Sequence, residues 1–471
     1  GVFAIFDNDN ASAHTALGLH ALQHRGQEAA GIVSFDSKQF YSERGLGQVG
    51  KIFSDEEVIK RLPGYSAIGH NRYSTSGNTI LRNVQPIFAE FEFGGFALAH
   101  NGNLTNAITL RKHLVKKGCI FQSTLDTEVI IHLMATSKYM NITDRLIDSL
   151  RQAKGAYSLV AMSDETIIGV RDPNGVRPLV LGKLENKSYI LSSETCALDI
   201  IGAEYIRDIE PGEVVIINKD GLESIKPFKK TQSKFCIFEY IYFARPDSLV
   251  DGNSIYESRK RIGEQLARES HIDSDLVIPV PDSGVPAAIG YSNISKTPYE
   301  LGIIRNHYIG RTFIEPGNHI RHLGVKLKHN ANKALVKGKK IILVDDSIVR
   351  GTTSTKIVEM MRGAGAKEVH MRIASPPTTN SCFYGVDTPE NSELLASKYN
   401  IENMRKFIKS DSLEFISIDG LYQAMNFKSR NRENPQFCDA CFTGEYPIEL
   451  IDREGGESNN QLSLLYEKNN S

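Results

Sequence analysis

The sequence predicts a chain of two mixed folds, an α+β domain followed by an α/β domain. The first half holds many short apolar runs separated by turns and few helices, which is typical of layered sheets. The second half alternates strand, loop and helix, as a parallel sheet with crossover helices does. A polar, basic stretch over 226–234 separates the two patterns. We therefore expect one domain over 1–230, another over 231–452, and a polar, flexible tail over 453–471.

Apolar patterning places the main elements in chain order. In the first half we expect strands over 2–6, 32–35, 67–70, 96–100, 157–162 and 167–170, and helices over 13–24 and 126–134. In the second half we expect strands over 276–280, 341–344 and 369–374, with a helix that ends at about residue 362. The strands over 67–70 and 96–100 both run into the dipeptide His-Asn.

Composition excludes several classes of protein. Hydrophobic residues make up 41% and charged residues 24% of 471 residues, which is typical of a globular protein. The net charge of -1 argues against nucleic-acid binding through a global positive field. No long apolar run and no signal peptide are apparent, so we expect a cytoplasmic protein with no membrane partner. Its six cysteines are then expected as reduced thiols, metal ligands or nucleophiles.

The most informative segment lies over 341–353. A four-residue apolar strand ends in Asp345 and Asp346, and a loop with hydroxyl groups and Gly351 then opens a helix. Helix N-termini bind phosphate, and a glycine lets the backbone approach the anion. The carboxylates would repel a phosphate in direct contact, but they suit sugar hydroxyls or Mg²⁺. The plainer interpretation is an acidic surface turn with a threonine cap.

This segment resembles the signature of type I phosphoribosyltransferases, which bind 5-phosphoribosyl-1-pyrophosphate (PRPP). The resemblance implies that Asp345 and Asp346 contact the ribose and a metal ion. It assigns PRPP binding to that doublet and to Ser347, Val349, Arg350, Gly351, Thr352, Thr353 and Lys326. Pro281-Asp282-Ser283-Gly284 looks like the pyrophosphate loop, so Ser283 would join the two aspartates around one Mg²⁺. The basic stretch over 305–330, which holds Lys326, suits a lid over pyrophosphate, or else a solvated loop.

Four short motifs mark the first half. They are Gly1-Val2-Phe3-Ala4-Ile5, His24-Arg25-Gly26-Gln27-Glu28, Gly69-His70-Asn71-Arg72-Tyr73-Ser74-Thr75 and His100-Asn101-Gly102-Asn103-Leu104. In this order they resemble the glutaminase domain of N-terminal-nucleophile amidotransferases, over roughly 1–230. The resemblance implies a four-layer αββα fold. Each motif alone has a plainer interpretation, since Asn-Gly also favours a hairpin turn.

The same resemblance implies roles for single residues. A cysteine at the chain start attacks the glutamine amide, and its own α-amino group, with a pKa of roughly 8, acts as the base. Asn101 and Gly102 would form the oxyanion hole. Arg72 would bind the carboxylate of glutamine and Asp126 its ammonium group, with Arg25 beside the glutamine site.

The expected cysteine nucleophile would precede Gly1, because the family pattern begins Cys-Gly-Val-Phe and this sequence begins Gly-Val-Phe. Two explanations are open. Either one residue is missing from the sequence, or this form does not hydrolyse glutamine. The other glutaminase motifs are intact, which favours the first explanation. The polypeptide as printed is predicted to use free ammonia and not glutamine.

Four of the six cysteines lie in the second half. Cys438 and Cys441 form a C-x-x-C pair, and Cys236 and Cys382 lie in separate contexts. The pair alone fits a redox couple, half of a zinc site or chance, and four thiolates fit zinc or an iron–sulfur cluster. Their contexts are similar to those of amidophosphoribosyltransferases of the iron–sulfur type. That likeness implies a [4Fe–4S] cluster on all four, tying the C-terminal part of the chain to the domain junction.

Together the two halves resemble the amidophosphoribosyltransferase family over nearly the whole chain. The resemblance implies transfer of glutamine-derived ammonia to C1 of PRPP in the first step of purine synthesis. It also implies a homotetramer inhibited by purine nucleotides. Aromatic residues over 240–248 would line an ammonia passage or simply belong to the core. Two alternatives stay open: another amidotransferase that shares only the glutaminase half, and a PRPP-sensing regulator that binds nucleic acid.

Overall fold

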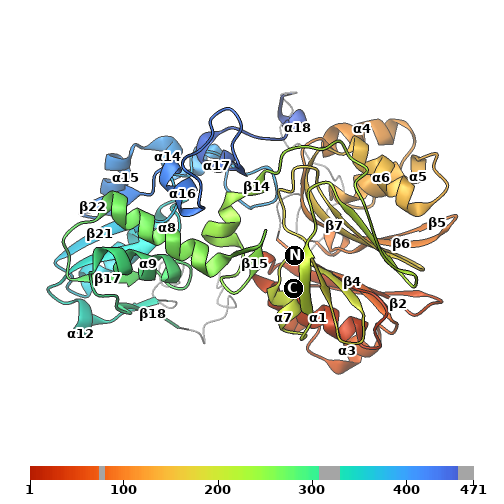
Figure 1. Cartoon of the computed structure of the whole chain (residues 1–471), viewed down its shortest axis with the longest axis horizontal. Helices are drawn as coiled ribbons and strands as arrows, with labels where there is room; N and C mark the ends of the chain where they lie inside the picture. Colours follow the sequence, from red (N-terminus) through yellow and green to blue (C-terminus); the bar gives the residue numbers. More distant parts are fainter. Residues whose placement is uncertain (74–79, 307–328, 455–471) are drawn as a thin grey trace.

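The computed structural model describes residues 1–73, 80–306 and 329–454, and shows two lobes side by side (Figure 1). The N-terminal lobe, red to yellow in the figure, holds two stacked sheets between helices. The C-terminal lobe, green to blue, holds a parallel sheet between helices. Both fold classes expected from the sequence are present.

Antiparallel strands build both sheets of the N-terminal lobe. The first sheet has the order β11 (Glu204–Asp208), β9 (Val180–Lys183), β10 (Tyr189–Ser192), β1 (Val2–Ile5), β4 (Ser66–Arg72), β2 (Ala29–Phe35) and β3 (Phe40–Leu46). The second has the order β13 (Gly221–Ile225), β12 (Val214–Asn218), β8 (Ile167–Arg171), β7 (Gly155–Ser163), β6 (Gly94–Leu104) and β5 (Ile87–Phe91). The helical segments are α1 (Ala11–Ala21), η1 (Gln23–Arg25), α2 (Val49–Ile52), α3 (Glu56–Lys60), η2 (Leu81–Asn83), α4 (Ala107–Lys116), α5 (Thr127–Thr136), α6 (Ile142–Gln152) and α7 (Cys196–Asp199).

Strand alternation explains the four layers. Successive side chains of a strand point to opposite faces, so a strand buried on both faces is apolar throughout. In β1, Phe3 and Ile5 pack with residues of α1, whereas Val2 and Ala4 pack toward residues of the second sheet. On the outer face of that sheet, Phe96 and Leu98 of β6 pack under α5 and α6. The lobe is therefore an αββα sandwich.

The C-terminal lobe has the strand order β17 (Leu276–Pro279), β20 (Lys340–Asp345), β21 (Glu368–Ile373) and β22 (Ser412–Phe415), all parallel. Ile342 and Val344 face the core under α8 (Ile255–Ser270) and α9 (Val285–Ser295). Ile341 and Leu343 face the core under α13 (Thr352–Gly363) and α15 (Ile401–Ile408). Other elements in the described part of this half are η3 (Glu239–Phe243), β15 (Leu249–Val250), β16 (Asn253–Ser254), β18 (Ile303–Arg305), β19 (His329–Ala331), α12 (Lys333–Val336), η4 (Asn391–Glu393), α14 (Leu395–Lys398) and α16 (Ile418–Ala424).

The end of the described chain returns to the junction between the lobes. β14 (Phe235–Cys236) pairs in parallel with β23 (Phe437–Cys438), which is followed by α17 (Ala440–Thr443) and α18 (Ile451–Glu454). Asp452 accepts hydrogen bonds from the backbone N–H groups of Ile108 and Thr109 at the start of α4. The C-terminal segment thus contacts both lobes. The rest of the predicted tail lies outside the described residues. Within the described ranges, no helix is long and apolar enough to cross a bilayer.

Candidate functional site

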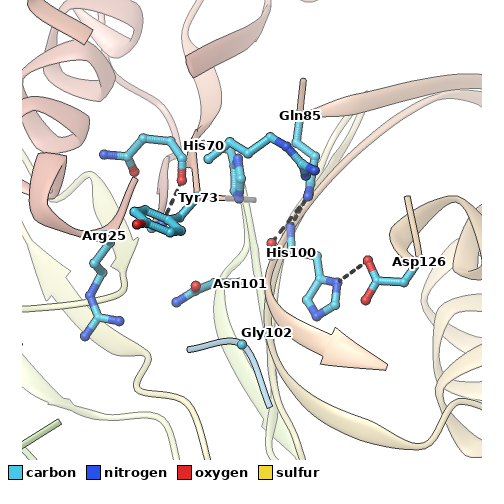
Figure 2. A pocket seen from close by; sticks show the side chains of 12 residues that line it. Arg25, His70, Tyr73, Gln85, His100, Asn101, Gly102 and Asp126 are labelled. Atoms are coloured by element: carbon cyan, nitrogen blue, oxygen red, sulfur yellow. Dashed lines mark hydrogen bonds and ion pairs between the residues drawn. The ribbon is translucent and has the colours of Figure 1, made fainter. Parts of the chain in front are cut away.

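The first site is a pocket between the two sheets of the N-terminal lobe (Figure 2). β1 begins beside β4, with Val2 opposite His70, so Gly1 lies next to the end of β4. The Gly1 nitrogen donates a hydrogen bond of 3.0 Å to the carbonyl oxygen of Asn71. The pocket is lined by the five residues that the sequence predicts for this site, Arg25, Arg72, Asn101, Gly102 and Asp126, and by seven others, Gly1, His70, Asn71, Tyr73, Gln85, His100 and Gly385.

Position 102 requires a glycine. Its φ is +143°, and a Cβ there would lie 2.0 Å from the carbonyl oxygen of Ala156 on β7. Asn101 precedes it, and its side-chain nitrogen lies 3.5 Å from the hydroxyl of Ser193. The same hydroxyl accepts a hydrogen bond of 2.9 Å from the backbone N–H of Val2. Asn101 is thereby held close to the start of the chain.

Two charged groups of opposite sign lie in the pocket. Arg72 is only 3% exposed, and its burial lowers its pKa against the opposing effects of Asp126 and Glu28. Burial would raise the pKa of Asp126, but His100 and the backbone N–H groups of Leu104 and Thr127 outweigh it and hold that pKa below its usual value. The pocket therefore offers a guanidinium and a carboxylate, which suits an amino acid.

The histidines of the pocket were not predicted as site residues. Burial lowers the pKa of His70 well below its usual value, and Arg72 acts in the same direction. His70 is therefore neutral at physiological pH. The backbone N–H of His100 donates to the side-chain oxygen of Gln85 at 2.7 Å. His100 directly precedes the predicted Asn101, and His70 lies two residues before the predicted Arg72. Both belong to His-Asn dipeptides, which is the signal that would have found them.

Arg25 reaches the pocket, but its guanidinium is bound elsewhere. It pairs with Glu194 and, at 2.7 Å, with Glu239 of η3 in the C-terminal half. Arg177 also donates to Glu239, at 3.0 Å. All of these side chains are fully buried, so each charge depends on its partners. The charge of Arg25 thus forms ion pairs at the junction between the lobes.

The second site lies at the carboxyl ends of β17 and β20. Asp345 and Asp346 are each 7% exposed. Burial raises the pKa of both carboxyls, and Asp346 raises that of Asp345 further. Ser283 in the loop after β17 hydrogen-bonds to Asp346. The structure therefore brings together the three oxygen groups that the resemblance assigns to Mg²⁺.

The loop from Ser347 to Gly351 leads directly into α13. Gly351 has a φ of +76°, and a Cβ there would lie 2.6 Å from Leu395. Arg350 pairs with Glu393 at 2.6 Å, and the N–H of Leu395 donates to the carbonyl oxygen of Val349 at 2.8 Å. Thr352 and Thr353 open the helix and are exposed. A phosphate would meet hydroxyl groups and free N–H groups there. Lys326 lies outside the described residues, as does most of the predicted lid.

The four predicted cysteine ligands gather at the junction. Cys236 and Cys438 are direct partners in the β14–β23 pair. The carbonyl oxygen of Cys441 accepts the N–H groups of Thr379 and Asn380, at 3.0 Å each, from the segment that leads to Cys382. Burial raises the pKa of Cys236 to about 11 and those of Cys438 and Cys441 well above the usual value. Among the described residues, no three His, Cys, Asp or Glu side chains converge as a single metal ion requires.

Comparison with known proteins gives consistent matches in both halves. Residues 70–199 match a family model for a glutamine amidotransferase domain, and residues 247–375 match one for a phosphoribosyl transferase domain. The amidophosphoribosyltransferase of Rhizobium etli is 57% identical over 471 residues, which is 99% of this chain and 95% of that protein. The amidophosphoribosyltransferase of Bacillus subtilis is 46% identical over 96% of this chain and 94% of its own length.

A solved structure extends the likeness to three dimensions. The glutamine PRPP amidotransferase of B. subtilis, complexed with ADP and GMP, superimposes with a TM-score of 0.90 at 45% identity. The match covers 95% of this chain and 97% of that one. Because it spans both halves, it excludes the two alternatives, a glutaminase relative without the transferase and a PRPP-sensing regulator. The chain belongs to the amidophosphoribosyltransferase family, whose members transfer the amide nitrogen of glutamine to C1 of PRPP in the first step of purine biosynthesis.

Proposed function

We propose that the pocket at Gly1 is the glutamine site of this enzyme, and that a cysteine joined to Gly1 is its nucleophile. The pocket that receives the Gly1 nitrogen also holds Asn101 and Gly102, and this observation carries the proposal. The cysteine thiol would give its proton to its own α-amino group and attack the amide carbon. The Asn101 side chain and the Gly102 N–H would then stabilise the oxyanion.

In this proposal Arg72 binds the carboxylate of glutamine and Asp126 its ammonium group. The two side chains carry opposite charges in one buried pocket, which favours an amino acid held by both ends. The guanidinium of Arg25 is bound to Glu194 and Glu239. Arg25 therefore contacts glutamine through its other atoms, which line the pocket.

Substitution of Arg72 tests the glutamine site. In enzyme that carries the cysteine, Arg72→Lys should raise KM for glutamine by about 10- to 100-fold, because lysine cannot form the bidentate pair. The ammonia-dependent rate should stay the same. Arg61→Lys is the matched control, since Arg61 is exposed and pairs with Glu43 on the surface. An unchanged KM in Arg72→Lys would contradict the assignment.

We further propose that PRPP binds at the carboxyl ends of β17 and β20. Asp345, Asp346 and Ser283 form a cluster of hard oxygen donors, and the mutual repulsion of the carboxylates favours a bound cation. The proposed magnesium ligands are these three residues. When bound, Mg²⁺ neutralises charge on the departing pyrophosphate.

Phosphate binding is assigned to the loop and helix start that follow the doublet. The proposed residues are Ser347, Val349, Arg350, Gly351, Thr352 and Thr353, with Lys326 from the lid segment. In the reaction, the lone pair of ammonia forms a bond to C1 of PRPP while the bond from C1 to the pyrophosphate oxygen breaks. The nitrogen then loses a proton. The residues contribute mainly orientation and charge stabilisation.

We also propose that Cys236, Cys382, Cys438 and Cys441 hold a [4Fe–4S] cluster. All four lie at one junction. Cys236 pairs with Cys438 between β14 and β23, and two backbone hydrogen bonds join the segment before Cys382 to Cys441. Cys236 and Cys438 are buried in one apolar cluster, and Cys382 packs against it. The donor set suits an iron–sulfur cluster, which would hold the C-terminal segment to the junction.

Anaerobic purification tests the cluster. We expect visible absorbance, with iron and sulfide each at about four per chain, and loss of both in Cys438→Ser. Cys119→Ser is the matched control, because Cys119 lies in the N-terminal lobe and is not a proposed ligand. Zinc bound in place of iron, or colourless enzyme with full activity, would contradict the proposal.

The domain limits of 1–230 and 231–452 are kept as a proposal, supported by the end of β13 at Ile225 and the start of β14 at Phe235. Purine nucleotides are proposed as feedback inhibitors, because the B. subtilis relative was solved with ADP and GMP. A homotetramer and a cytoplasmic location stay predictions of the family resemblance.

A further inference from the structure

The segment 381–395 of the C-terminal lobe reaches both candidate sites. At one end, Gly385 lines the glutamine pocket of the N-terminal lobe. At the other end, Glu393 pairs with Arg350 and the N–H of Leu395 bonds to Val349 in the phosphate loop. Figure 2 shows a blue segment of the C-terminal half passing beside Gly102. One stretch of chain therefore supports the walls of two sites.

Side-chain hydrogen bonds close the base of this segment. The Asn391 side-chain oxygen accepts the backbone N–H of Ser381 at 2.7 Å and the Ser381 hydroxyl at 2.8 Å. The hydroxyl of Thr388 accepts the N–H of Cys382 at 2.6 Å. These bonds join the two ends of the loop 381–391 and hold its tip in place. The loop has little regular structure, so side chains supply this support.

At the tip of the loop, the backbone of Gly385 lies against the backbone of Gly102 in the proposed oxyanion hole. Gly385 has a φ of +100°, and a Cβ there would lie 2.7 Å from the Cα and 3.0 Å from the carbonyl carbon of Gly102. Next to this contact, the Asn103 side chain donates to the carbonyl oxygen of Phe383 at 3.4 Å. Tyr73, which lines the same pocket, hydrogen-bonds to Asp387. The loop thus contacts two residues of the glutamine pocket, Gly102 and Tyr73, and their neighbour Asn103.

We propose that Gly385 is a positioning residue for the release of ammonia from glutamine, because it supports the backbone of Gly102 in the proposed oxyanion hole. We propose further that Asn391 holds Gly385 in this place. The Gly102 backbone lies against Ala156 of β7 and against Gly385. An oxyanion hole works only when its hydrogen-bond donor already points at the place where the oxyanion forms. Support of Gly102 by Gly385 should therefore affect the chemical step more than the binding of glutamine. The inference rests on the proposed role of Gly102. It makes the phosphoribosyl half a structural part of the glutamine site.

Substitution at the glycine tests the contact. In enzyme that carries the cysteine, Gly385→Ala should lower kcat for glutamine hydrolysis by about 10- to 100-fold, with a much smaller change in KM for glutamine. The rate with ammonia and PRPP reports that the enzyme is folded, and it should be retained. Gly338→Ala is the matched control, because Gly338 also has a positive φ, +73°, but no atom lies within 4 Å of an added Cβ. A glutaminase kcat equal to that of this control would overturn the proposal.

A second pair of variants tests the support at the loop base. Asn391→Ala removes the oxygen that accepts both Ser381 bonds, and Asn391→Asp keeps an acceptor there. We expect Asn391→Ala to lower the ratio of glutamine-dependent to ammonia-dependent rate, and Asn391→Asp to restore it. Equal ratios in both variants and the parent would overturn the role of Asn391.

These experiments distinguish failure of the positioning role of Gly385 from failure of the proposed glutamine site. If the parent enzyme with its cysteine shows no glutamine-dependent rate, the proposed function fails. If the parent is active and Gly385→Ala equals the Gly338→Ala control, the glutamine site stands and only the positioning role is overturned.

Discussion

Replacement of Asp345 and Asp346 together by asparagine should lower PRPP turnover by about 100-fold or more, with either ammonia or glutamine as the nitrogen source. The doublet lies where β20 meets the phosphate loop, and Ser283 from the neighbouring loop bonds to it. Asparagine keeps the shape and some hydrogen bonds but loses the charge that holds a magnesium ion. Pyrophosphate release at saturating magnesium measures the effect.

The fold of this variant should stay intact. Because burial raises the pKa of both carboxyls, their ionised forms weaken the metal-free fold at neutral pH, and neutral side chains should not lower Tm. The matched control replaces Glu56 and Glu57 of α3 by glutamine. These are adjacent, exposed carboxylates and give the same change of charge. Turnover in the doublet variant equal to that of this control would contradict the assignment.

The enzyme that begins at Gly1 and the enzyme with a cysteine before Gly1 should differ by about 1,000-fold or more in glutamine-dependent rate. No cysteine is among the described residues that line the pocket, and in the second form a cysteine would be joined to the Gly1 nitrogen, which lies there. Both should use ammonia equally, because the phosphoribosyl site is the same. Glutamate release and PRPP turnover with each nitrogen source measure the two properties.

A serine before Gly1 is the control for this comparison. It restores the chain length and the α-amino group but offers a weaker nucleophile than cysteine. We expect it to behave like the enzyme that begins at Gly1. Glutamine hydrolysis by the form without cysteine, at the rate of the cysteine form, would mean that the nucleophile lies elsewhere.

Local patterns were sufficient for the parts of the structure that depend on neighbours in sequence. The apolar run before Asp345 forms β20, and Gly351 opens α13, as expected from the loop chemistry. Arg72, Asn101, Gly102 and Asp126 were expected in one site because the motifs follow a family order, and they line one pocket. Buried β1 and β7 were found because both of their faces are covered and their sequences are apolar.

Contacts between distant segments could not be read from sequence. β3 is partly exposed and polar along its length, so its apolar signal is weak. The pairing of Arg25 with Glu239 crosses the junction between the lobes, and Arg25 alone gave no sign that its charge is bound there. Gly385 lies in an irregular loop and contacts Gly102 only because the lobes meet. Such contacts depend on tertiary packing, which local periodicity does not encode.

Calorimetric titration of PRPP into the enzyme, with magnesium present, tests the central claim that the doublet and the loop after it bind PRPP. We predict a binding heat with one PRPP per chain, lost in the Asp345→Asn, Asp346→Asn variant and retained in the Glu56→Gln, Glu57→Gln control. Absence of heat in the parent enzyme, or equal affinity in parent and doublet variant, would contradict the claim.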